Sequence, residues 1–416
     1  GIKNMQKENK LPVDDMWQWK GDAKFSNTVA VGDQVFISGQ QTLDKDGVVL
    51  NPGDIAAQTR NVFENMKSSL VGLNMGLDDL VRLNTYYVFE GDDKDATTFW
   101  EDMTRVRLEY FPDPGPAATA VRAKGMPYEG QLIQIEGVAL RGESRRCRQR
   151  IMPEGSWDWS IAVPLSQGWK IGNRIFVGGQ ISADKTGRPV HVGDLDAQTR
   201  NIYEYIGRVL SDAGASFSDL TRVKICFKYD SKDSNSGQAF VDRIMEVSKE
   251  YIKGTPPVVT AFAVDLLYPG LDLELDAMAI VDQDTKALAP NELGGRYQPS
   301  EFSDGVLADG EIYIGGQTAT EPDGSVMFPG DFSAQANEVF QRLDRVLQEA
   351  DATLKDIVKL NLFIVAQDAQ VEEFFHQACR VWTEVSPNSY PAMTPVRVHE
   401  LPKPGLLFQA DCIAIK

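Results

Sequence analysis

Residues 31–40 read VGDQVFISGQ, and the chain repeats this stretch as IGNRIFVGGQ at 171–180 and as DGEIYIGGQ at 309–317. Each copy opens beside a turn-forming glycine, continues through β-branched and aromatic residues, and ends on Gly-Gln, which predicts a strand that leaves a tight turn. A second signature, Asp-x-x-Ala-Gln, follows every copy, at 54–58, 194–198 and 331–335. Both signatures recur after 140 and then 137 residues, so three similar modules fill the chain.

The spacing places the modules at 1–145, 146–287 and 288–416. Such a period is the size of a small domain, so each module should have its own core and share interfaces with its neighbours. Because 42% of the 416 residues are hydrophobic, the chain has enough apolar mass for a large core.

Charge restricts the partners that we expect. The chain has 42 Lys and Arg against 60 Asp and Glu, a net charge of −18. This acidic balance disfavours a broad phosphate-binding face, so no nucleic-acid partner is expected. The one basic cluster, RGESRRCRQR at 141–150, falls between the first two modules, and we interpret it as a solvated linker in preference to a nucleic-acid patch.

Signals for targeting and for metal binding are lacking in the sequence. No apolar run is long enough to cross a bilayer, and the polar residues 1–10 lack the apolar centre of a signal peptide, so we expect a cytoplasmic protein without a membrane partner. The four cysteines form no Cys-x-x-Cys pair, and only three histidines are present. This pattern indicates neither a disulfide framework nor a zinc site, and no metal or cofactor is expected.

The expected order of elements in module one is strand, strand, helix, strand, helix, strand, strand. A hairpin is expected where TLDKDGVVL turns at Asp-Gly, and Asp54 has the position of a helix N-cap. The later strands are expected at 81–89, 118–123 and 132–140, with the second helix at 96–110. Helices on one face of each sheet indicate an α+β fold, in which three sheets bury their other faces together as a pseudo-threefold barrel with the helices outside.

These residues carry a family resemblance. The strand ending in Ser-Gly-Gln, the Asp-x-x-Ala-Gln helix start, the Pro-Ala-x-Thr strand at 116–119 and 391–394, and the final strand resemble the RidA/YjgF/UK114 family of enamine and imine deaminases, three times over. The resemblance implies a chorismate-mutase-like fold. Since known members are homotrimers with pockets between subunits, it also implies that this chain is a fused trimer, a monomer that mimics a trimer, with a higher oligomer left open.

The family's carboxylate-binding arginine is absent from all three modules. The matching positions are Ala118, about Val259, and Met393. A guanidinium binds a carboxylate through two parallel hydrogen bonds, which an aliphatic side chain cannot replace. The resemblance therefore implies that ordinary amino-acid-derived imines are poor substrates.

The family's final-strand glutamate, which is thought to handle water, is kept in one module only. The matching residues are Gln134, Glu274 and Gln409. Hydrolysis of an imine needs a polarised water and a proton delivered to nitrogen, and a partly desolvated carboxyl group can supply the proton. Glu274 is therefore the candidate catalytic residue, with Gln134 and Gln409 as candidates that orient substrate or water. The alternative is a structural, hydrogen-bonded Glu274.

Further residues are candidates for substrate binding. Ser38 and Gly39 belong to the Ser-Gly-Gln signature, and Phe25 stands where the family has a tyrosine. Two tryptophan pairs also recur 140 residues apart, at Trp17 and Trp19 and at Trp157 and Trp159. Because alternate residues of an extended segment share a face, each pair either packs a leading segment or forms an aromatic wall for an apolar or planar substrate.

Two other arginines lie near the position of the lost one. Arg122 and Arg397 follow it by four residues on the same strand face in modules one and three. Either they form salt bridges at the module interfaces or they contact an anionic group of a longer substrate.

These observations favour a RidA-like hydrolase or deaminase that acts on a C–N bond of a small, apolar or aromatic substrate in a pocket between modules. The alternative is a non-catalytic small-molecule binding or scaffold protein with decayed sites. Ribonuclease activity, reported for some relatives, is disfavoured by the acidic charge. A single cleft that gathers titratable groups around Glu274 would favour the enzyme.

Overall fold

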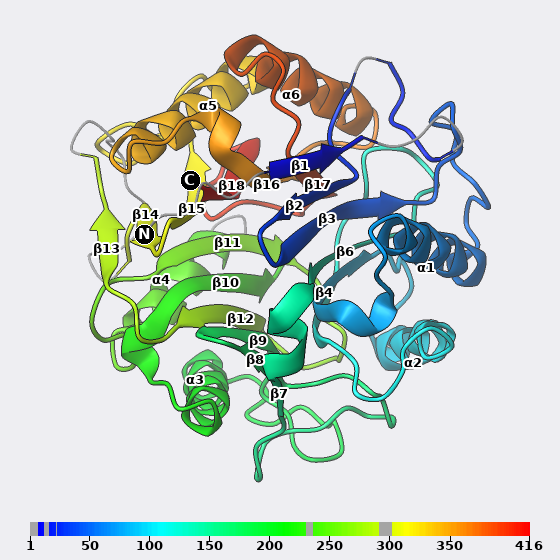
Figure 1. Ribbon diagram of the computed structural model, residues 1–416, viewed down its shortest axis with the longest axis vertical. Helices are drawn as coiled ribbons and strands as arrows, with labels where there is room; N and C mark the ends of the chain where they lie inside the picture. Colours follow the sequence, from blue (N-terminus) through cyan, green and yellow to red (C-terminus); the bar gives the residue numbers. More distant parts are fainter. Residues whose placement is uncertain (1–6, 12–15, 22, 230–235, 291–301) are drawn as a thin grey trace.

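Three six-stranded sheets form a ring around a common centre, and the helices cover the outside of the ring (Figure 1). The computed structural model describes residues 7–11, 16–21, 23–229, 236–290 and 302–416. The predicted α+β architecture of three tandem modules is confirmed.

Each module repeats one order of elements. Module 1 contains β1 (Lys7–Lys10), β2 (Thr28–Val31), β3 (Gln34–Gln41), α1 (Ile55–Val71), β4 (Leu80–Tyr87), α2 (Ala96–Arg107), β5 (Ala117–Arg122) and β6 (Ile133–Leu140). Module 2 contains β7 (Arg148–Ile151), β8 (Gly168–Ile171), β9 (Arg174–Gln180), α3 (Leu195–Asp212), β10 (Leu220–Lys228), α4 (Ser236–Ser248), β11 (Val258–Val264) and β12 (Leu273–Ile280). Module 3 contains β13 (Thr285–Leu288), β14 (Gly305–Ala308), β15 (Glu311–Thr318), α5 (Phe332–Gln348), β16 (Ile357–Ile364), α6 (Val371–Val385), β17 (Ala392–Arg397) and β18 (Phe408–Ile415).

The sheet of module 1 has the strand order β1-β2-β3-β6-β4-β5, and the other two sheets have the corresponding order. Only the edge pairs β4–β5, β10–β11 and β16–β17 are parallel. Short 3-10 helices precede the middle strands at Leu77–Asp79, Phe217–Asp219 and Leu354–Asp356, and others lie at Asp93–Asp95 and Gly142–Cys147.

The structure corrects the expected order of elements at the start of each module. Each module begins with a short extra strand, β1, β7 or β13. The sequence pattern did not reveal these strands, because each has only four residues and lacks a clear alternation of apolar and polar residues. The expected hairpin at 42–50 forms only one bridge, between Leu43 and Val49, and the second strand before the helix is β3. The basic cluster ends in β7, and β13 begins three residues before the predicted boundary at 288.

The Asp-x-x-Ala-Gln signature has a structural explanation. Asp54 caps α1 by accepting a hydrogen bond from the backbone N–H of Ala57, as an N-cap aspartate does. The buried Gln58 side chain donates to the carbonyl of Gly130 at 2.8 Å and accepts from the N–H of Leu132 at 2.8 Å. The signature thus ties the start of the helix to the loop before the final strand. Equivalent contacts occur at Asp194 and Gln198 and at Asp331 and Gln335.

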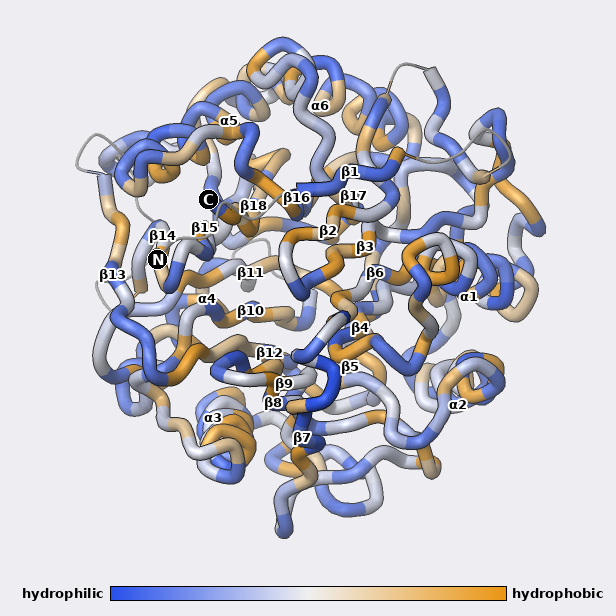
Figure 2. Tube along the Cα trace, in the orientation of Figure 1, coloured by the Kyte–Doolittle hydropathy of each residue, from blue (hydrophilic) through white to orange (hydrophobic). Residues whose placement is uncertain are grey.

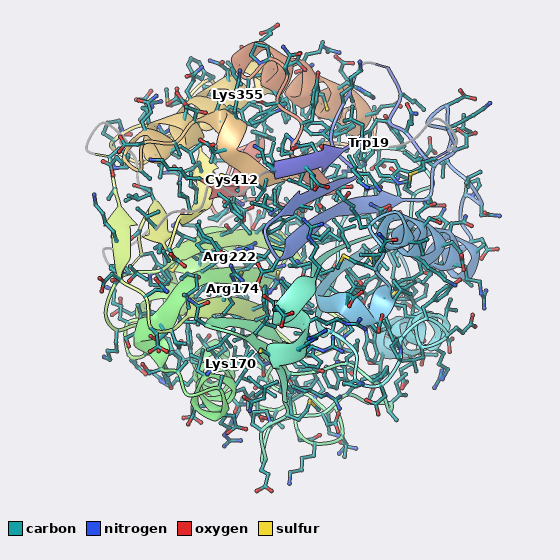
Figure 3. All side chains as sticks on the ribbon, in the orientation of Figure 1. Trp19, Lys170, Arg174, Arg222, Lys355 and Cys412 are labelled. Atoms are coloured by element: carbon teal, nitrogen blue, oxygen red, sulfur yellow. The ribbon has the colours of Figure 1, made fainter. Side chains whose placement is uncertain are left out.

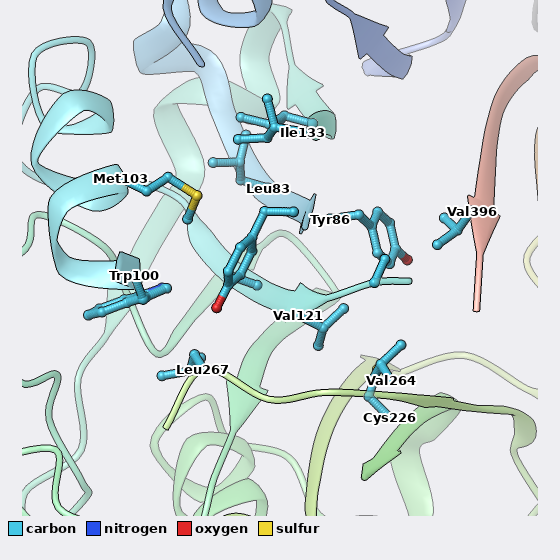
Figure 4. Close-up of a cluster of buried hydrophobic side chains, with 14 of the residues drawn as sticks. Leu83, Tyr86, Trp100, Met103, Val121, Ile133, Cys226, Val264, Leu267 and Val396 are labelled. Atoms are coloured by element: carbon cyan, nitrogen blue, oxygen red, sulfur yellow. The ribbon is translucent and has the colours of Figure 1, made fainter. Parts of the chain in front are cut away.

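Apolar packing joins the modules. In Figure 2 hydrophobic residues mark both the inner strands and one part of each outer helix, as expected for amphipathic helices on a sheet. One buried cluster draws on the inner faces of all three sheets, through Phe36, Val81, Trp169, Phe176, Met278, Val306 and Ile413 among others. A second cluster, shown in Figure 4, brings Trp100 and Tyr86 of module 1 against Cys226 and Leu267 of module 2 and Val396 of module 3.

Buried carboxylates also join the modules near the centre of the ring. Glu136, Asp276 and Asp411 occupy equivalent positions on the three final strands, and each accepts a hydrogen bond from a threonine of the preceding module. The threonines are Thr119 at 2.8 Å from Asp276, Thr260 at 2.7 Å from Asp411, and Thr394 beside Glu136. The same contact therefore repeats around the ring.

Candidate functional site

The candidate site occurs three times, once at each junction between modules. At every junction the edge strand of one module lies beside the segment that leads the next module, through the bridges Ala117 to Ser166, Val258 to Ser303 and Ala392 to Ser26. We name these junctions 1–2, 2–3 and 3–1 after the modules that they join. Each brings the position of the lost arginine next to the Gly-Gln signature and the final-strand Glu or Gln, as the family resemblance implies.

Junctions 3–1 and 2–3 each hold a glutamine whose amide is used across the interface. Gln134 donates its amide N–H to the carbonyl of Pro395 in module 3, and its oxygen accepts from Gln41 at 2.7 Å. Gln409 donates to the carbonyl of Ala261 in module 2 at 3.1 Å. Both side chains pack directly against a glycine of the Gly-Gln signature. At Gly39, for example, an added Cβ would lie 2.5 Å from the side-chain oxygen of Gln134.

Junction 1–2 holds Glu274 at the same position. The side chain is 2% exposed and lies on Gly179, where a Cβ would be 2.0 Å from Glu274 Oε2. Among the described residues, no hydrogen-bond partner is found for Glu274 Oε1. Burial raises the pKa of this carboxyl well above its usual range, Asp276 raises it further, and Lys224 lowers it. Because burial disfavours the charged form, Glu274 keeps its proton to a higher pH than an exposed glutamate does.

A protonated Glu274 also has a structural alternative. Ala120 in module 1 has the strand position that Pro395 and Ala261 have in the other edge strands. A carboxylic acid has the shape of a glutamine amide and one O–H donor, so Glu274 can donate to the Ala120 carbonyl as the glutamines donate to theirs. The difference is that the proton of Glu274 can be transferred.

Other buried titratable groups accompany Glu274 at junction 1–2. Cys226 lies directly opposite Glu274 in the strand pair β10–β12, and burial raises the pKa of its thiol. Burial likewise raises the pKa of Tyr87, whose hydroxyl has no partner among the described residues. Modules 2 and 3 have Phe227 and Ile364 at the position of Tyr87. Junction 1–2 therefore holds three buried titratable side chains, those of Glu274, Cys226 and Tyr87.

The tryptophan pairs are tied to the Gly-Gln signature. Trp17 donates its indole N–H to Gln40 at 3.2 Å, and Trp157 donates to Gln180 at 3.0 Å. The two rings of each pair lie close together, 5.3 Å apart for Trp17 and Trp19 and 4.8 Å apart for Trp157 and Trp159. All four rings are buried, so packing of the leading segments is what the contacts show; a role as a substrate wall stays a prediction.

Junction 3–1 contains a cavity of about 230 Å³. Trp17, Trp19, Phe25, Ser38 and Met393 line it, so four predicted binding residues come together around one position of the lost arginine. No carboxylate or histidine is among the described residues that line this cavity. The cavity can hold a small apolar ligand, and Lys24 is the one charged side chain among its described lining residues.

Junction 2–3 is nearly closed. Its cavity has a volume of only about 20 Å³ and is lined by Val259, Ala261, Gly316 and Gln409, among others. Gly315 replaces Ser38 here, and a Cβ at Gly315 would be 2.7 Å from the carbonyl oxygen of Val259. The glycine therefore allows the two modules to pack backbone to backbone.

Arg122 and Arg397 form ion pairs within their own modules. Arg122 lies 3.1 Å from Asp93 and donates to the carbonyl of Phe89, and Arg397 lies 2.7 Å from Asp368 and donates to the carbonyl of Ala366. Arg397 also lines an open cleft of about 530 Å³ on the outer side of junction 3–1. Their guanidinium groups are thus already paired, and contact with a substrate anion stays a prediction.

The sequence interpretation missed one set of polar residues. Arg82, Arg222 and Lys359 occupy equivalent positions in β4, β10 and β16, and Lys224 stands where the other modules have Asn84 and Asn361. A signal was present, since charged residues alternate with apolar residues in strands that are buried on both faces. The described residues contain no group of three or more His, Cys, Asp or Glu side chains that could hold a metal ion.

Comparison with known proteins identifies the class of this architecture. The family model for endoribonuclease L-PSP matches residues 19–141, 159–281 and 297–416. The chain therefore belongs to the endoribonuclease L-PSP family, and it is a fusion of three modules of the RidA type.

Individual relatives match either one module or the whole architecture. RutC family proteins of Pyrococcus abyssi and Pyrococcus horikoshii are 34% and 33% identical over 117 residues, which are 28% of this chain and 86% of each relative. A crystal structure of chorismatase covers 81% of this chain and 93% of its own with a TM-score of 0.53 at 12% identity, which shows a similar fold over several modules. RidA from an Antarctic Psychrobacter is 28% identical over 32% of this chain and 100% of its own, with a TM-score of 0.28. No described helix has the length and apolarity needed to cross a membrane.

Proposed function

We propose that this chain hydrolyses the C–N bond of a small imine or enamine at junction 1–2, with Glu274 as the group that moves the proton. One observation carries the proposal: Glu274 is a buried carboxyl with a raised pKa at the position where the other two junctions have glutamine. A carboxyl group with a raised pKa is suited to general acid and base catalysis near neutral pH, whereas a glutamine amide cannot titrate.

The proposed reaction needs two proton transfers from Glu274 to nitrogen and two back to Glu274. Glu274 first donates its proton to the imine nitrogen, which makes the imine carbon more electrophilic. A water molecule attacks this carbon, and the Glu274 carboxylate accepts a proton from it. Glu274 then protonates the amine nitrogen; the C–N bond breaks, ammonia leaves, and the hydroxyl proton returns to Glu274 as the carbonyl forms. Lys224 stabilises the carboxylate between these transfers, since its charge lowers the pKa of Glu274.

The expected substrate carries no carboxylate at the reacting end. Ala118 stands at junction 1–2 in place of the family's arginine, so the carboxylate of an α-imino acid would be desolvated without a guanidinium partner. The neighbouring side chains Leu165, Trp157 and Trp159 are apolar or aromatic. Although the family is named for endoribonuclease activity, the net charge of −18 disfavours RNA as the substrate.

The test is ammonia release from the N-unsubstituted imine of an aryl ketone, compared with the α-imino acid derived from leucine. We expect faster release from the aryl imine. The variant Glu274→Gln should lower turnover by about 10²–10⁴-fold with little change in substrate affinity, because it removes the proton and keeps the shape. The matched control is Glu250→Gln, an exposed glutamate of the same module that pairs with Arg200. Near-normal turnover in Glu274→Gln, or rapid turnover of the α-imino acid, would contradict the proposal.

A second candidate function is small-molecule binding without catalysis, and the cavity at junction 3–1 favours it. That cavity is lined by aromatic rings, and no carboxylate or histidine is among its described lining residues. If it binds a planar ligand, quenching of tryptophan fluorescence by that ligand should be lost in Trp19→Leu and kept in Trp159→Leu. Binding with no ammonia release from any imine would favour this function over the first.

We also propose that one chain closes its own ring in solution. Every junction that a homotrimer forms between subunits is formed here within the chain, through the three bridges and the shared central core. Light scattering should give the mass of one chain, 46.1 kDa, or a whole multiple of it. A separately expressed module that is monomeric and well folded would contradict this proposal, because its junction faces are apolar.

A further inference from the structure

A small cavity lies at the centre of the ring, where the inner faces of the three sheets meet. Its volume is about 30 Å³, and its lining includes the rings of Phe36, Phe176 and Tyr313. The cationic side chains Arg82, Arg222 and Lys359, one from each module, also line it. Figure 3 places Arg222 close to the middle of the molecule. A polar space of this size holds one water molecule or one monatomic ion.

Two of the three cations are hydrogen-bonded to a carboxylate of the next module. Arg82 lies 2.6 Å from Asp276, to which Lys224 also makes an ion pair at 3.0 Å. Lys359 forms an ion pair with Glu136. These groups are therefore paired in the way that buried charges require.

Arg222 is the exception. Its nearest carboxylate, Asp411, lies 3.5 Å away, and none of its N–H groups makes a hydrogen bond to a described residue. The residue is only 9% exposed, and it lines the cavity. A guanidinium carries five N–H donors, so several donors of Arg222 are left for a group in the cavity.

Asp411 accepts hydrogen bonds from two other side chains. Thr260 donates to Asp411 Oδ2 at 2.7 Å, and Asn361 donates to Asp411 Oδ1 at 2.7 Å. Neutral donors thus occupy both oxygens, and the oxygen nearest Arg222 is the one that Thr260 uses. Arg222 is left with charge attraction and no direct hydrogen bond.

The charges of the cavity lining do not balance. Three cationic side chains line the cavity, Arg82, Arg222 and Lys359, whereas Glu136 is the one carboxylate among the described lining residues. The lining therefore has an excess of positive charge, and a buried charge that lacks close compensation is costly.

We propose that the axial cavity binds one small monovalent anion of the size of chloride, held by the guanidinium of Arg222. The anion is attracted by the cationic lining and accepts hydrogen bonds from the guanidinium of Arg222, which Asp411 does not accept. Because the site draws on all three modules, an anion bound there stabilises the closed ring. This site is separate from junction 1–2 and does not depend on the proposed reaction.

The test compares thermal unfolding of the full chain in potassium chloride and potassium gluconate at constant ionic strength. A ligand that binds only the folded chain raises its stability with concentration, so above the dissociation constant we expect Tm to rise by about 1–2 °C for each tenfold increase in chloride. Arg222→Gln should abolish this dependence. Arg174→Gln is the matched control and should keep it, because Arg174 is hydrogen-bonded to Glu311 at 2.8 Å and module 1 already has Gln34 at that position.

A second measurement covers the case in which Arg222→Gln does not fold. Crystals of the unaltered chain grown in bromide should show an anomalous peak in the axial cavity beside Arg222. Density for water alone would overturn the proposal, and water is the natural alternative because Asn84 Oδ1, also at this cavity, lacks a partner among the described residues. A Tm that is equal in chloride and gluconate, or a dependence that persists in Arg222→Gln, would overturn it as well.

Discussion

Junction 1–2 differs from junctions 2–3 and 3–1 in two residues that change together. Module 2 has Lys224 and Glu274 on the paired strands β10 and β12, where module 1 has Asn84 and Gln134. Module 3 has Asn361 and Gln409, so two modules share the neutral pair and one has the charged pair. A homotrimer must use one sequence at all three junctions, whereas a fused chain can place a titratable pair at a single junction. For the reaction proposed above, the comparison favours junction 1–2 as the reacting site and packing or binding at the other two junctions.

The largest effect on stability is expected at Asp276, which serves two cations at junction 1–2. Asp276→Asn leaves Arg82 and Lys224 buried without their carboxylate, and the loss of one partner from a buried ion pair typically costs about 3–5 kcal/mol. Guanidinium unfolding should show this loss in the free energy of unfolding. Asp411→Asn is the matched control with a smaller expected loss, because its cation, Arg222, lies 3.5 Å away. Equal losses in the two variants would remove the distinction between the junctions.

How far the sequence predicts this structure depends on how local each signal is. The helix caps and the repeat spacing are local patterns, so Asp54 and the three-module fold were predicted correctly. The leading strands were missed because β1 carries no apolar alternation; its residues, KENK, are polar and mostly exposed. β1 is a strand because it pairs with β2, and a local sequence pattern does not encode this pairing.

The same limit applies to the candidate site. Repeat alignment placed Glu274, Gln134 and Gln409 at equivalent positions, and the structure brings each to a junction. The alignment did not indicate that Arg222 lacks a direct hydrogen bond to Asp411, because that depends on how side chains of modules 2 and 3 meet. Contacts between residues far apart in the chain decide such details, and one sequence alone does not specify them.

The next largest effect on stability is expected at Arg122 and Arg397, and it separates a structural ion pair from a contact with a substrate anion. If these residues are structural, Arg122→Met should lower the free energy of unfolding by about 1–3 kcal/mol, because the carbonyl of Phe89 loses a buried donor. Arg397→Met should cost a similar amount through the carbonyl of Ala366. Substrate affinity should be unchanged in both variants. A rise in KM for an anionic substrate without a loss of stability would instead show that the arginine contacts the ligand.

The pH dependence of stability is the third effect, and its sign follows from the raised pKa of Glu274. The folded chain holds this proton at a pH where the unfolded chain has released it, so Glu274 stabilises the folded state fully below the ordinary carboxyl pKa and progressively less as the pH rises toward the raised value. Over that range the chain should lose stability relative to Glu274→Gln by up to about 1.4 kcal/mol per pH unit.

The measurement is the free energy of unfolding of both proteins at a series of pH values above 5. The glutamine fits, because Gln134 and Gln409 already occupy the equivalent positions. Glu250→Gln, an exposed control, should follow the unaltered chain at every pH. A difference between Glu274→Gln and the unaltered chain that stays constant with pH would show that Glu274 is not protonated in the folded state.

The smallest effect, and the one that tests the paired change directly, is expected from Lys224→Asn. This substitution gives module 2 the residue of the other modules, and Arg82 still pairs with Asp276, so the fold should persist. Lys224 lowers the pKa of Glu274, and its removal should raise that pKa. Because the proposed reaction starts from the protonated acid, the fall in ammonia release on the alkaline side of the pH–rate profile should move to higher pH. Lys67→Asn, an exposed lysine on α1, should leave the profile unchanged, and a shift to lower pH in Lys224→Asn would mean that Glu274 acts in its ionised form.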